Sequence, residues 1–347
     1  MSLFVDIHKR LNDFSLDVSF EAERGVFGLL GASGCGKSYT LKCIAGIEKP
    51  DSGKIVLDGV TLFDSERKID LPPQKRKVGY LFQNYALFPN MTVRQNILCG
   101  LRSEKDRKKR EDELERVLSL FQIEDLINHK PHQISGGQAQ RVALARIMVS
   151  KPNVLLLDEP FSALDAHLKE KLQLEMKGIL ENFGKSVIMV THSRDEAYHM
   201  CARIAAMDGG SICRLDETKR LFADPYSVAA AQITGCKNIT AAYKVGDYEI
   251  DAPEWGVRLT SAQPVRDDIK AVGLRAHYFN VKSHQNSFPI EITGKMEEPF
   301  EVIVEFRYLN QREDSPNLWW RIPKDRLPNP YPNELGIAPV NVNLLYG

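Results

Sequence analysis

A glycine-rich loop that ends in Lys-Ser constrains this chain more than any other stretch. The apolar run 26–30 leads into it, and its eight residues are Gly31-Ala32-Ser33-Gly34-Cys35-Gly36-Lys37-Ser38. Glycines allow successive backbone N–H groups to curl around a phosphate, and the helix that follows points its positive end at the same group. The pattern predicts a phosphate-binding loop between a buried strand and a helix. A plain glycine turn between a strand and a helix is the alternative.

The end of the loop carries the chemistry that a bound polyphosphate requires. The Lys37 ammonium would neutralise β- and γ-phosphate oxygens, and the Ser38 hydroxyl would ligate Mg²⁺. We include the next residue, Tyr39, among the expected contacts to the ligand. The loop therefore predicts a nucleotide site with a magnesium ion.

Length and charge limit the class of protein. A chain of 347 residues exceeds the size at which a single core stops growing, so two domains are expected. Its 46 basic and 46 acidic residues balance, which argues against a nucleic-acid partner. The charged run 104–110 could be a nucleic-acid patch, but it mixes acids with bases beside an amphipathic segment. We interpret it as the solvated face of a helix.

Cysteine spacing and hydropathy indicate the cellular compartment of the protein. The 6 cysteines form no C-x-x-C pair, so neither a disulfide framework nor a zinc site is expected. The first residues lack the basic-then-apolar pattern of a signal sequence, and no window approaches the about 18 consecutive apolar residues of a membrane span. We expect a protein that is cytosolic or held at a cytosolic surface.

Strand and helix patterns alternate over the first two thirds of the chain. Residues 3–30 alternate in strand fashion, a hairpin is expected at Asp58-Gly59, and a helical insertion is expected at about 84–150. The alternation then resumes with a strand at 154–157, a helix at 162–180 and a strand at 187–190. This order predicts an α/β domain over 1–232, with a mostly parallel sheet and an antiparallel β subdomain.

The last third of the chain has a different sequence pattern. It consists of short β segments separated by Pro, Gly and Asn, among them 269–274, 302–306, 318–322 and 340–345. A small all-β, OB-like domain is expected over 233–347.

Two carboxylates follow the apolar strand 154–157. Asp158 and Glu159 would stand at the carboxyl end of that strand, where open α/β sheets bind ligands. Asp158 can hold the Mg²⁺ shell, and Glu159 can accept a proton from an attacking water. An apolar strand that ends in Asp-Glu is also a common exit into a loop, so the assignment depends on the phosphate loop upstream.

A third segment combines a helix cap with two glycines. Ser135 is a suitable N-cap, and Gly136, Gly137 and Gln138 follow it. Each glycine inside a helix costs about 1 kcal/mol relative to alanine. The expected use of these glycines is to bring bare amides and a helix N-terminus against a phosphate.

These three segments, in this order, resemble the ATP-binding cassette ATPase family over about residues 1–230. The resemblance implies ATP as the nucleotide. Gln83 matches the family's Q-loop glutamine, which senses Mg²⁺ and water and lies beside the surface that docks a membrane subunit. His192 matches the switch histidine, and the D-loop is matched by Ser162-Ala163-Leu164-Asp165. Phe14 is the candidate for the aromatic residue that stacks on adenine, although it could equally face the core.

The resemblance also implies a mechanism that needs two copies of the chain. Each ATP would be bound by the phosphate loop of one copy and by residues 135–138 of the other. Glu159 would polarise water, His192 would contact the γ-phosphate, and Gln83 and Asp158 would complete the magnesium site with Ser38. One chain alone would hold half a site.

The layout narrows the family further. With no membrane span and no second cassette, the chain resembles a separate importer subunit on the cytoplasmic face of the membrane. Integral permeases would be its direct partners, and an extracytoplasmic solute-binding protein an indirect one. The segment 71–80 most resembles the molybdate, tungstate and sulfate branch, so molybdate is the expected solute. Sugars, polyamines and iron remain alternatives, as does a soluble ATPase without a transporter.

Two further expectations concern single residues. Lys237 and Arg275 could bind an oxyanion if residues 233–347 are a regulatory sensor, although such residues on β segments are more often solvated or salt-bridged. Cys35 lies inside the phosphate loop, so alkylation is expected to inhibit the ATPase and bound ATP to protect it.

Overall fold

The computed structural model describes residues 2–11, 14–102, 104–162 and 166–347, and the chain divides into two compact units, residues 1–218 and residues 219–347. Each unit contains a hydrophobic core of its own. Within the described residues, no helix is long and apolar enough to cross a membrane.

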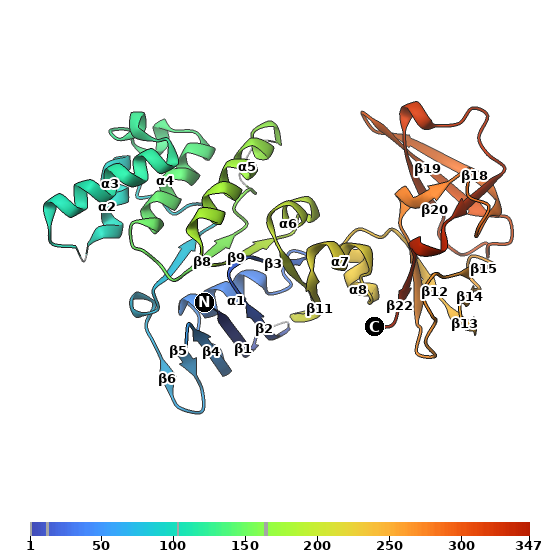
Figure 1. The fold of residues 1–347 in the computed structure, drawn as a ribbon, viewed down its shortest axis with the longest axis horizontal. Helices are drawn as coiled ribbons and strands as arrows, with labels where there is room; N and C mark the ends of the chain where they lie inside the picture. Colours follow the sequence, from blue (N-terminus) through green and yellow to red (C-terminus); the bar gives the residue numbers. More distant parts are fainter. Residues whose placement is uncertain (1, 12–13, 103, 163–165) are drawn as a thin grey trace. The chain divides into compact units, whose positions relative to one another are not determined.

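The first unit is built on one mixed sheet (Figure 1). In spatial order, its strands in the described part of the chain are β6 (Ile69–Asp70), β5 (Val60–Asp64), β4 (Ser52–Leu57), β1 (Leu3–Arg10), β2 (Ser15–Ala22), β11 (Ser211–Glu217), β10 (Arg203–Asp208), β3 (Gly25–Gly31), β9 (Ser186–Thr191), β8 (Val154–Asp158) and β7 (Val78–Leu81). The strands from β10 to β7 run parallel, and those from β6 to β2 are antiparallel. The predicted parallel core and antiparallel subdomain are both present.

The register of the parallel strands brings three predicted segments to one edge of the sheet. Leu30 of β3 lies opposite Thr191 of β9, and Val190 of β9 lies opposite Asp158 of β8. Because parallel strands share a direction, the residues that leave β3, β8 and β9 emerge side by side. Strands β8 and β9 are buried along their whole length, which explains their uninterrupted apolar sequences.

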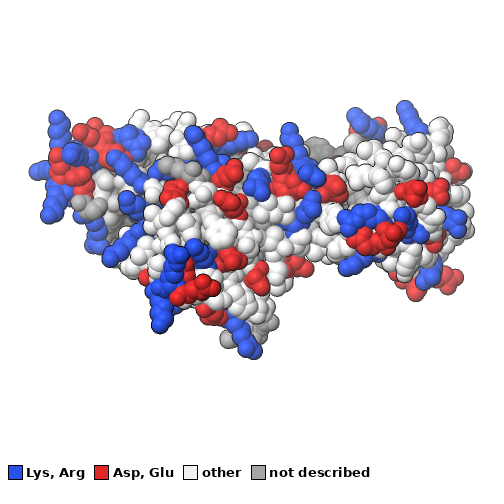
Figure 2. Space-filling view, turned by 60° about the horizontal axis from the view of Figure 1, so that its bottom comes forward, with Lys and Arg blue, Asp and Glu red and all other residues white. Residues whose placement is uncertain are grey.

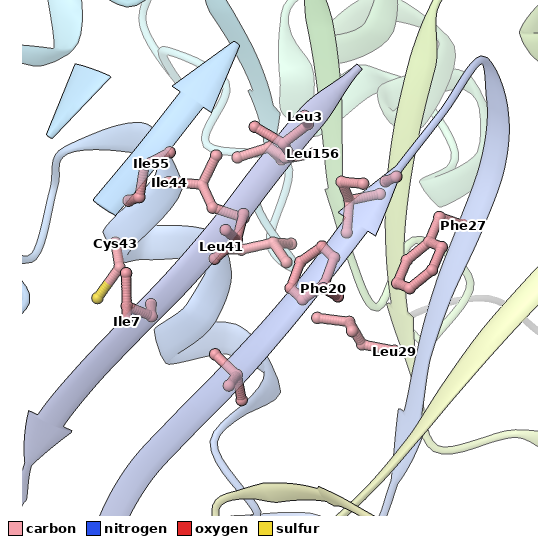
Figure 3. Packing of buried hydrophobic residues seen from close by; sticks show 14 of the residues in the cluster. Leu3, Ile7, Phe20, Phe27, Leu29, Leu41, Cys43, Ile44, Ile55 and Leu156 are labelled. Carbon is pink, nitrogen blue, oxygen red and sulfur yellow. The ribbon is translucent and has the colours of Figure 1, made fainter. Parts of the chain in front are cut away.

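The helix that follows the phosphate loop packs against the antiparallel strands. In Figure 3, side chains of α1 (Lys37–Ala45) meet side chains of β1, β2, β3, β4 and β8 in one cluster, whose labelled members are Leu3, Ile7, Phe20, Phe27, Leu29, Leu41, Cys43, Ile44, Ile55 and Leu156. The rings of Phe20 and Phe27 stack with centroids 5.0 Å apart. This packing fixes the start of α1, and with it the loop.

A buried arginine holds the other end of α1. The Nη1 group of Arg76 donates to the carbonyl oxygens of Cys43 (2.8 Å) and Ile44 (3.0 Å), and its Nη2 group donates to Asp70 (2.9 Å). Carbonyls at a helix C-terminus have no partner within the helix, so the guanidinium satisfies them. A Cβ at Gly46 would lie 2.5 Å from Arg76 Nε, so the helix must end there on glycine.

In its described residues, the predicted insertion contains three α-helices, α2 (Val93–Leu98), α3 (Arg107–Phe121) and α4 (Gly136–Met148). Helix α3 buries one apolar stripe made of Leu114, Val117, Leu118 and Phe121, while residues 105–109 are exposed. Basic and acidic side chains are interspersed on the face shown in Figure 2. The charged run at 104–110 fits the solvated face that its sequence predicts.

Two more helices belong to the first unit. Helix α5 (Ala166–Phe183) begins inside the predicted helix 162–180, and it buries Leu172, Met176 and Leu180. Residues 163–165, including the predicted site residue Asp165, lie outside the described residues. Helix α6 (Arg194–Met200) follows β9 and contacts both β3 and β9.

The second unit begins within α7 (Thr218–Ala223), at its second residue, and continues with α8 (Val228–Ile233). The sequence places the domain boundary later, at 232/233, next to the last residue of α8. Helix α8 associates with the β domain because Ala231 packs on Ala271 and Leu345, and because Val228 N donates to Gly347 O at 2.9 Å.

The rest of the second unit is all β, as expected for an OB-like domain. Its described strands form three sheets, β12 (Asn238–Ala241), β16 (Ala271–Leu274) and β22 (Val342–Leu345); β13 (Tyr243–Gly246), β14 (Glu249–Ala252) and β15 (Val257–Thr260); and β17 (Phe279–Asn280), β21 (Glu334–Ile337), β18 (Phe288–Glu297), β19 (Glu301–Tyr308) and β20 (Leu318–Pro323). Trp320, Phe306 and Tyr308 are buried at the centre of its core.

Candidate nucleotide site

The phosphate loop has the backbone that its glycines predict. Gly34 and Gly36 have φ values of 85° and 99°, in the left-handed region that favours glycine. A Cβ at Gly31 would lie 2.3 Å from the carbonyl oxygen of Met207, so a side chain does not fit there. Ala32, Ser33 and Gly34 are exposed, so this part of the loop is open to a ligand.

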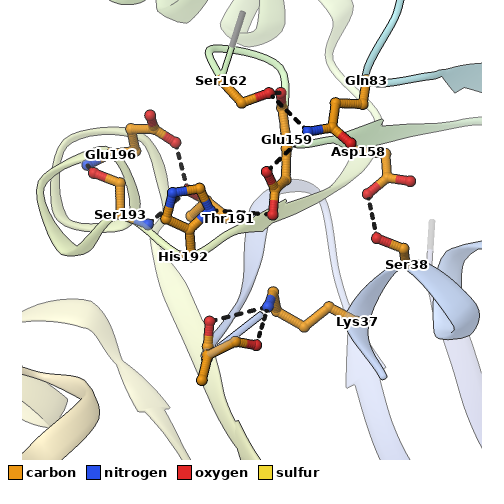
Figure 4. A network of polar contacts seen from close by, with 12 residues as sticks. Lys37, Ser38, Gln83, Asp158, Glu159, Ser162, Thr191, His192, Ser193 and Glu196 are labelled. Carbon is orange, nitrogen blue, oxygen red and sulfur yellow. Dashed lines mark hydrogen bonds and ion pairs between the residues drawn. The ribbon is translucent and has the colours of Figure 1, made fainter. Parts of the chain in front are cut away.

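Lys37 is held over the loop rather than extended into solvent. Its side chain is buried, and its Nζ donates to the carbonyl oxygens of Gly31 (2.9 Å) and Ala32 (2.7 Å) (Figure 4). These two bonds place a positive charge at the mouth of the glycine loop. A phosphate group at the loop would meet that charge together with the N-terminus of α1.

Ser38 and Asp158 face each other across the edge of the sheet. The Ser38 hydroxyl donates to Asp158 Oδ1 at 2.7 Å, and the Tyr80 hydroxyl donates to Asp158 Oδ2 at 2.8 Å. Burial, and then the charge of Asp158, raise the pKa of Tyr80, so its proton stays on the phenol. Motif reasoning missed Tyr80, because nothing in the sequence links a strand tyrosine to a carboxylate far along the chain.

The three residues predicted to be catalytic lie together. His192 Nδ1 is 3.1 Å from Glu159 Oε1, and Gln83 Nε2 lies 3.4 Å from both Glu159 Oε2 and Ser162 Oγ (Figure 4). Glu159 has a φ of 46°, which is uncommon for a residue with a side chain, and its N–H donates to Val190 O at 3.0 Å. Strain of this kind persists where the surrounding structure enforces it, and it concentrates at functional sites.

The loop after Gln83 is tied to α4 by an arginine that the motifs did not reveal. Tyr85 and Ala86 both have positive φ values, 59° and 43°. The Arg146 guanidinium donates to their carbonyl oxygens at 3.0 Å and 2.8 Å. Gln83 therefore precedes a backbone turn that α4 holds in place.

The Ser135 segment forms the expected capped helix start. The Ser135 hydroxyl accepts from Gln138 N, and the Gln138 side chain accepts from Ser135 N at 2.8 Å. Gly136 is exposed, but Gly137 is buried, and a Cβ there would lie 2.8 Å from Leu172 of α5. Packing against α5 therefore requires Gly137, a reason that the sequence did not suggest.

Phe14 and Tyr39 lie beside the loop. Phe14 is half-buried against the core, and a Cβ at Gly36 would lie 3.3 Å from its ring. The Tyr39 ring is half-buried next to Lys42. A role for Phe14 in stacking on adenine stays a prediction.

Cys35 differs from its expected environment. Its side chain belongs to the buried core cluster and is 7% exposed, rather than packed among the loop amides. The Sγ atom lies behind the loop, 3.7 Å from Lys37 Nζ. The side chain thus packs into the hydrophobic core and not toward the face of the loop that a ligand would meet.

We therefore expect Cys35 to react slowly with N-ethylmaleimide in the native protein. The half-buried Cys99 and Cys213 should be alkylated first, while Cys43 should stay unmodified because burial raises its pKa to about 12. Mass spectrometry of a labelling time course would measure the order. Early labelling of Cys35, with protection by ATP, would restore the expectation drawn from the sequence.

The donor set fits a magnesium ion. The Ser38 hydroxyl, the Asp158 carboxylate and the Gln83 amide supply oxygen ligands, which Mg²⁺ prefers. Asp158 and Gln83 also line a cavity of about 460 Å³, together with Lys42, Phe82, Asn84 and Ser162. Within the described residues, no cluster of His, Cys, Asp and Glu forms a competing metal site.

The fold and this edge of the sheet define a phosphate-loop nucleotide-binding cassette. Residues 12–162 match the family model described as ABC transporter. The ATP-binding cassette MJ0796, solved as a dimer in a post-hydrolysis state with ADP and Pi, is 28% identical with a TM-score of 0.53. That match covers 63% of this chain and 99% of the solved one.

Curated relatives match about two thirds of this chain. The putrescine transport ATP-binding protein PotG of Escherichia coli (strain K12) is 44% identical over 64% of this chain and 58% of its own length. The molybdenum import ATP-binding protein ModC of Paramagnetospirillum magneticum (strain ATCC 700264 / AMB-1) is 36% identical over 70% of this chain and 64% of its own length. The chain thus spans about three fifths of the length of the curated relatives it matches.

Proposed function

We propose that this protein is the ATP-hydrolysing subunit of an importer. The observation that carries the proposal is the cluster of Glu159, His192 and Gln83 beside Lys37 and the Ser38–Asp158 pair, at one edge of an ABC cassette sheet. The ATP-binding names of the relatives support the choice of nucleotide.

Each residue at the edge has a distinct role in this proposal. Lys37 and the loop amides bind the β- and γ-phosphates, and Ser38, Asp158 and Gln83 hold Mg²⁺, which supplies charge neutralisation on the phosphate oxygens. Glu159 accepts the proton of the attacking water, since its carboxylate faces the exposed His192 side of the site. His192 contacts the γ-phosphate and is oriented by Glu159.

Tyr80 offers a test of the metal assignment. Replacing Tyr80 by Phe removes one of the two hydroxyl groups that orient Asp158, without a change in shape. Because a hydrogen bond to a charged group contributes about 1.5–3 kcal/mol, we expect the Mg²⁺ concentration for half-maximal stimulation of ATP binding to rise about tenfold. Fluorescence titration of a labelled ATP with Mg²⁺ measures this.

The control for this variant is Tyr248→Phe, at an exposed position of the second unit. It should leave the Mg²⁺ dependence unchanged, and ATP binding without Mg²⁺ should be the same in both variants. An unchanged Mg²⁺ requirement in Tyr80→Phe would count against Asp158 as a metal ligand.

We further propose that two copies complete two sites, each with residues 135–138 facing the partner's phosphate loop. The exposed N-terminus of α4, with Ser135 and Gly136 at its surface, supports this arrangement. The dimeric state named for MJ0796 supports it also. A monomer then lacks the second source of N–H donors to the γ-phosphate.

Mixing two inactive variants tests the shared site. Lys37→Ala removes the phosphate contact in its own half-site, and Ser135→Arg blocks the surface offered to the partner. Each alone should be inactive, and equal mixing should restore part of the ATPase activity, because half of the sites in a mixed dimer combine two intact surfaces. No recovery in demonstrably mixed dimers would argue for a site complete within one chain.

Molybdate, the solute expected from the sequence, is not the solute that the relatives favour. The polyamine relative is 44% identical and the molybdenum relative 36%. We therefore propose polyamines as the first solute to test and molybdate as the second. In such importers the cargo contacts the permease and an extracytoplasmic solute-binding protein rather than the cassette. The cassette itself would lie at the cytoplasmic face of the membrane.

Reconstitution with the permease decides between the solutes. With the solute-binding protein present, the cognate solute should stimulate ATP hydrolysis in proteoliposomes, and the other should not. Stimulation by neither would point to another solute, and failure to associate with any permease would favour a soluble ATPase.

Contacts in the second unit do not favour an anion sensor built on Arg275 and Lys237. The Arg275 guanidinium donates to the carbonyl oxygens of Thr234 (2.8 Å) and Phe222 (2.5 Å), so it braces the start of the unit. The Nζ atom of Lys237 lies over the Trp319 ring, 5.8 Å from its centroid. We propose a regulatory role for this unit without assigning it a ligand.

A further inference from the structure

A buried carboxylate next to the nucleotide site has no role in the mechanism described so far. Glu196 lies in the first turn of α6 and is only 4% exposed. A buried carboxylate loses its hydration, so its presence has to be explained by the groups that it contacts.

The contacts of Glu196 converge on the turn that carries His192. One carboxylate oxygen, Oε1, is 2.5 Å from Lys169 Nζ of α5. The other, Oε2, accepts a hydrogen bond from the Thr191 hydroxyl (Figure 4). The same hydroxyl oxygen accepts from Ser193 N at 3.0 Å, and Ser193 Oγ accepts from Glu196 N at 3.4 Å. The residues on both sides of His192 are therefore fixed through Glu196.

His192 itself depends on this support. Its side chain is 53% exposed, and its ring reaches Glu159 at 3.1 Å. An exposed imidazole has several rotamers open to it, so its direction is set by the backbone from which it projects. The turn between Thr191 and Ser193 supplies that backbone.

We propose that Glu196 is a positioning residue, which is anchored by Lys169 and holds the 191–193 turn so that His192 faces Glu159 and the nucleotide. The expected effect of Glu196 on catalysis rests on the proposed ATPase function. The expected effect of Glu196 on the orientation of His192 does not depend on that function.

An ion pair that served only to stabilise the fold would not need hydrogen bonds to the 191–193 turn. A buried pair contributes little to stability compared with apolar packing, and an apolar side chain at 196 could fill the same space. The Glu196 carboxylate instead accepts from the Thr191 hydroxyl, whose oxygen in turn accepts from Ser193 N, so it reaches both neighbours of His192. This pattern is expected of a residue that fixes direction.

Thr191 allows a test with almost no change in shape. Thr191→Val removes the hydroxyl that links Glu196 to Ser193, and Thr191→Ser keeps it. Because a displacement of about 1 Å in a reacting group can cost about 100-fold in rate, we expect kcat to fall about 100-fold in Thr191→Val with KM for ATP nearly unchanged. Thr191→Ser should restore most of the rate.

Two further variants and two controls extend the comparison. Glu196→Gln and Lys169→Met should lower kcat in the same way, without a matching change in KM. Thr218→Val removes another buried threonine hydroxyl, which donates to Cys201 O, and should leave kcat unchanged. Asp195→Asn changes an exposed carboxylate next to Glu196 and should also leave kcat unchanged.

Chemical modification of His192 tests the orientation without any hydrolysis. The ATP-free protein is treated with diethyl pyrocarbonate, and all 8 histidines are followed by mass spectrometry. In Thr191→Val and Glu196→Gln, the modification rate of His192 should rise several-fold while the other histidines keep their wild-type rates. This result would support the positioning role even if the wild-type protein proved unable to hydrolyse ATP, in which case the proposed function alone would fail.

Two results would overturn the inference. One is an unchanged His192 modification rate in Glu196→Gln and Thr191→Val. The other is a rise at every histidine together with equal losses in kcat and ATP affinity, which would show general loosening instead of a local role.

Discussion

Replacing Glu159 with Gln is expected to lower kcat about 1,000-fold, since a positioned general base contributes about 10²–10⁴ to the rate. Glutamine fills the same volume and can keep the contacts with Gln83 and His192, so the geometry around the γ-phosphate should persist. ATP binding should therefore stay near the wild-type level. With hydrolysis blocked, ATP should trap the dimer, which size-exclusion chromatography would detect.

The control is Glu181→Gln, on an exposed position near the end of α5. It should hydrolyse ATP at the wild-type rate and show no trapped dimer. A Glu159→Gln protein with wild-type hydrolysis would remove Glu159 from the mechanism.

Lys37→Ala is expected to have the other large effect, and it should act on binding. The Lys37 ammonium is buried at the loop mouth, and its loss leaves both the phosphates and the Gly31 carbonyl without a charged partner. Two or three charge-assisted hydrogen bonds disappear at once, so we expect ATP affinity to fall by about 100-fold or more. Isothermal titration calorimetry measures the change directly.

Lys49→Ala is the matched control, because the Lys49 side chain is 71% exposed and pairs only with Asp70 in the contacts described. Its ATP affinity should equal that of the wild type. Equal affinities for Lys37→Ala and Lys49→Ala would mean that the phosphates bind elsewhere.

The sequence predicted the parts of this site that depend on backbone pattern. The phosphate loop and the Asp158-Glu159 pair were identifiable because glycine spacing and an apolar strand are local features. The parallel register then brings Gly31, Asp158 and Thr191 to one edge without any further information. The resemblance to a family added Gln83 and His192, and the structure places both beside Glu159.

The supporting residues could not be predicted because their partners are distant in the chain. Tyr80 lies 78 residues from Asp158, and Arg146 lies 60 residues from Ala86. A tyrosine on a strand or an arginine on a helix has many possible partners, and only the packed structure selects one. The environment of the Cys35 thiol differs from the expected packing among the loop amides for the same reason, since its side chain lies in the core cluster.

The limits of the two domains could also be predicted only in part from the sequence. Short β segments separated by turn residues predicted the second unit well. The helices α7 and α8 resemble the end of an α/β domain in sequence, yet Ala231 packs on Leu345, more than a hundred residues later. No local pattern encodes that contact.

The central claim is that one chain holds half of each ATP site. The most direct measurement is the rate of phosphate release per chain at saturating Mg²⁺ and ATP, as a function of protein concentration. The rate per chain should be close to zero at low concentration and rise to a plateau as dimers form. A rate per chain that stays constant while light scattering reports a monomer would contradict the claim.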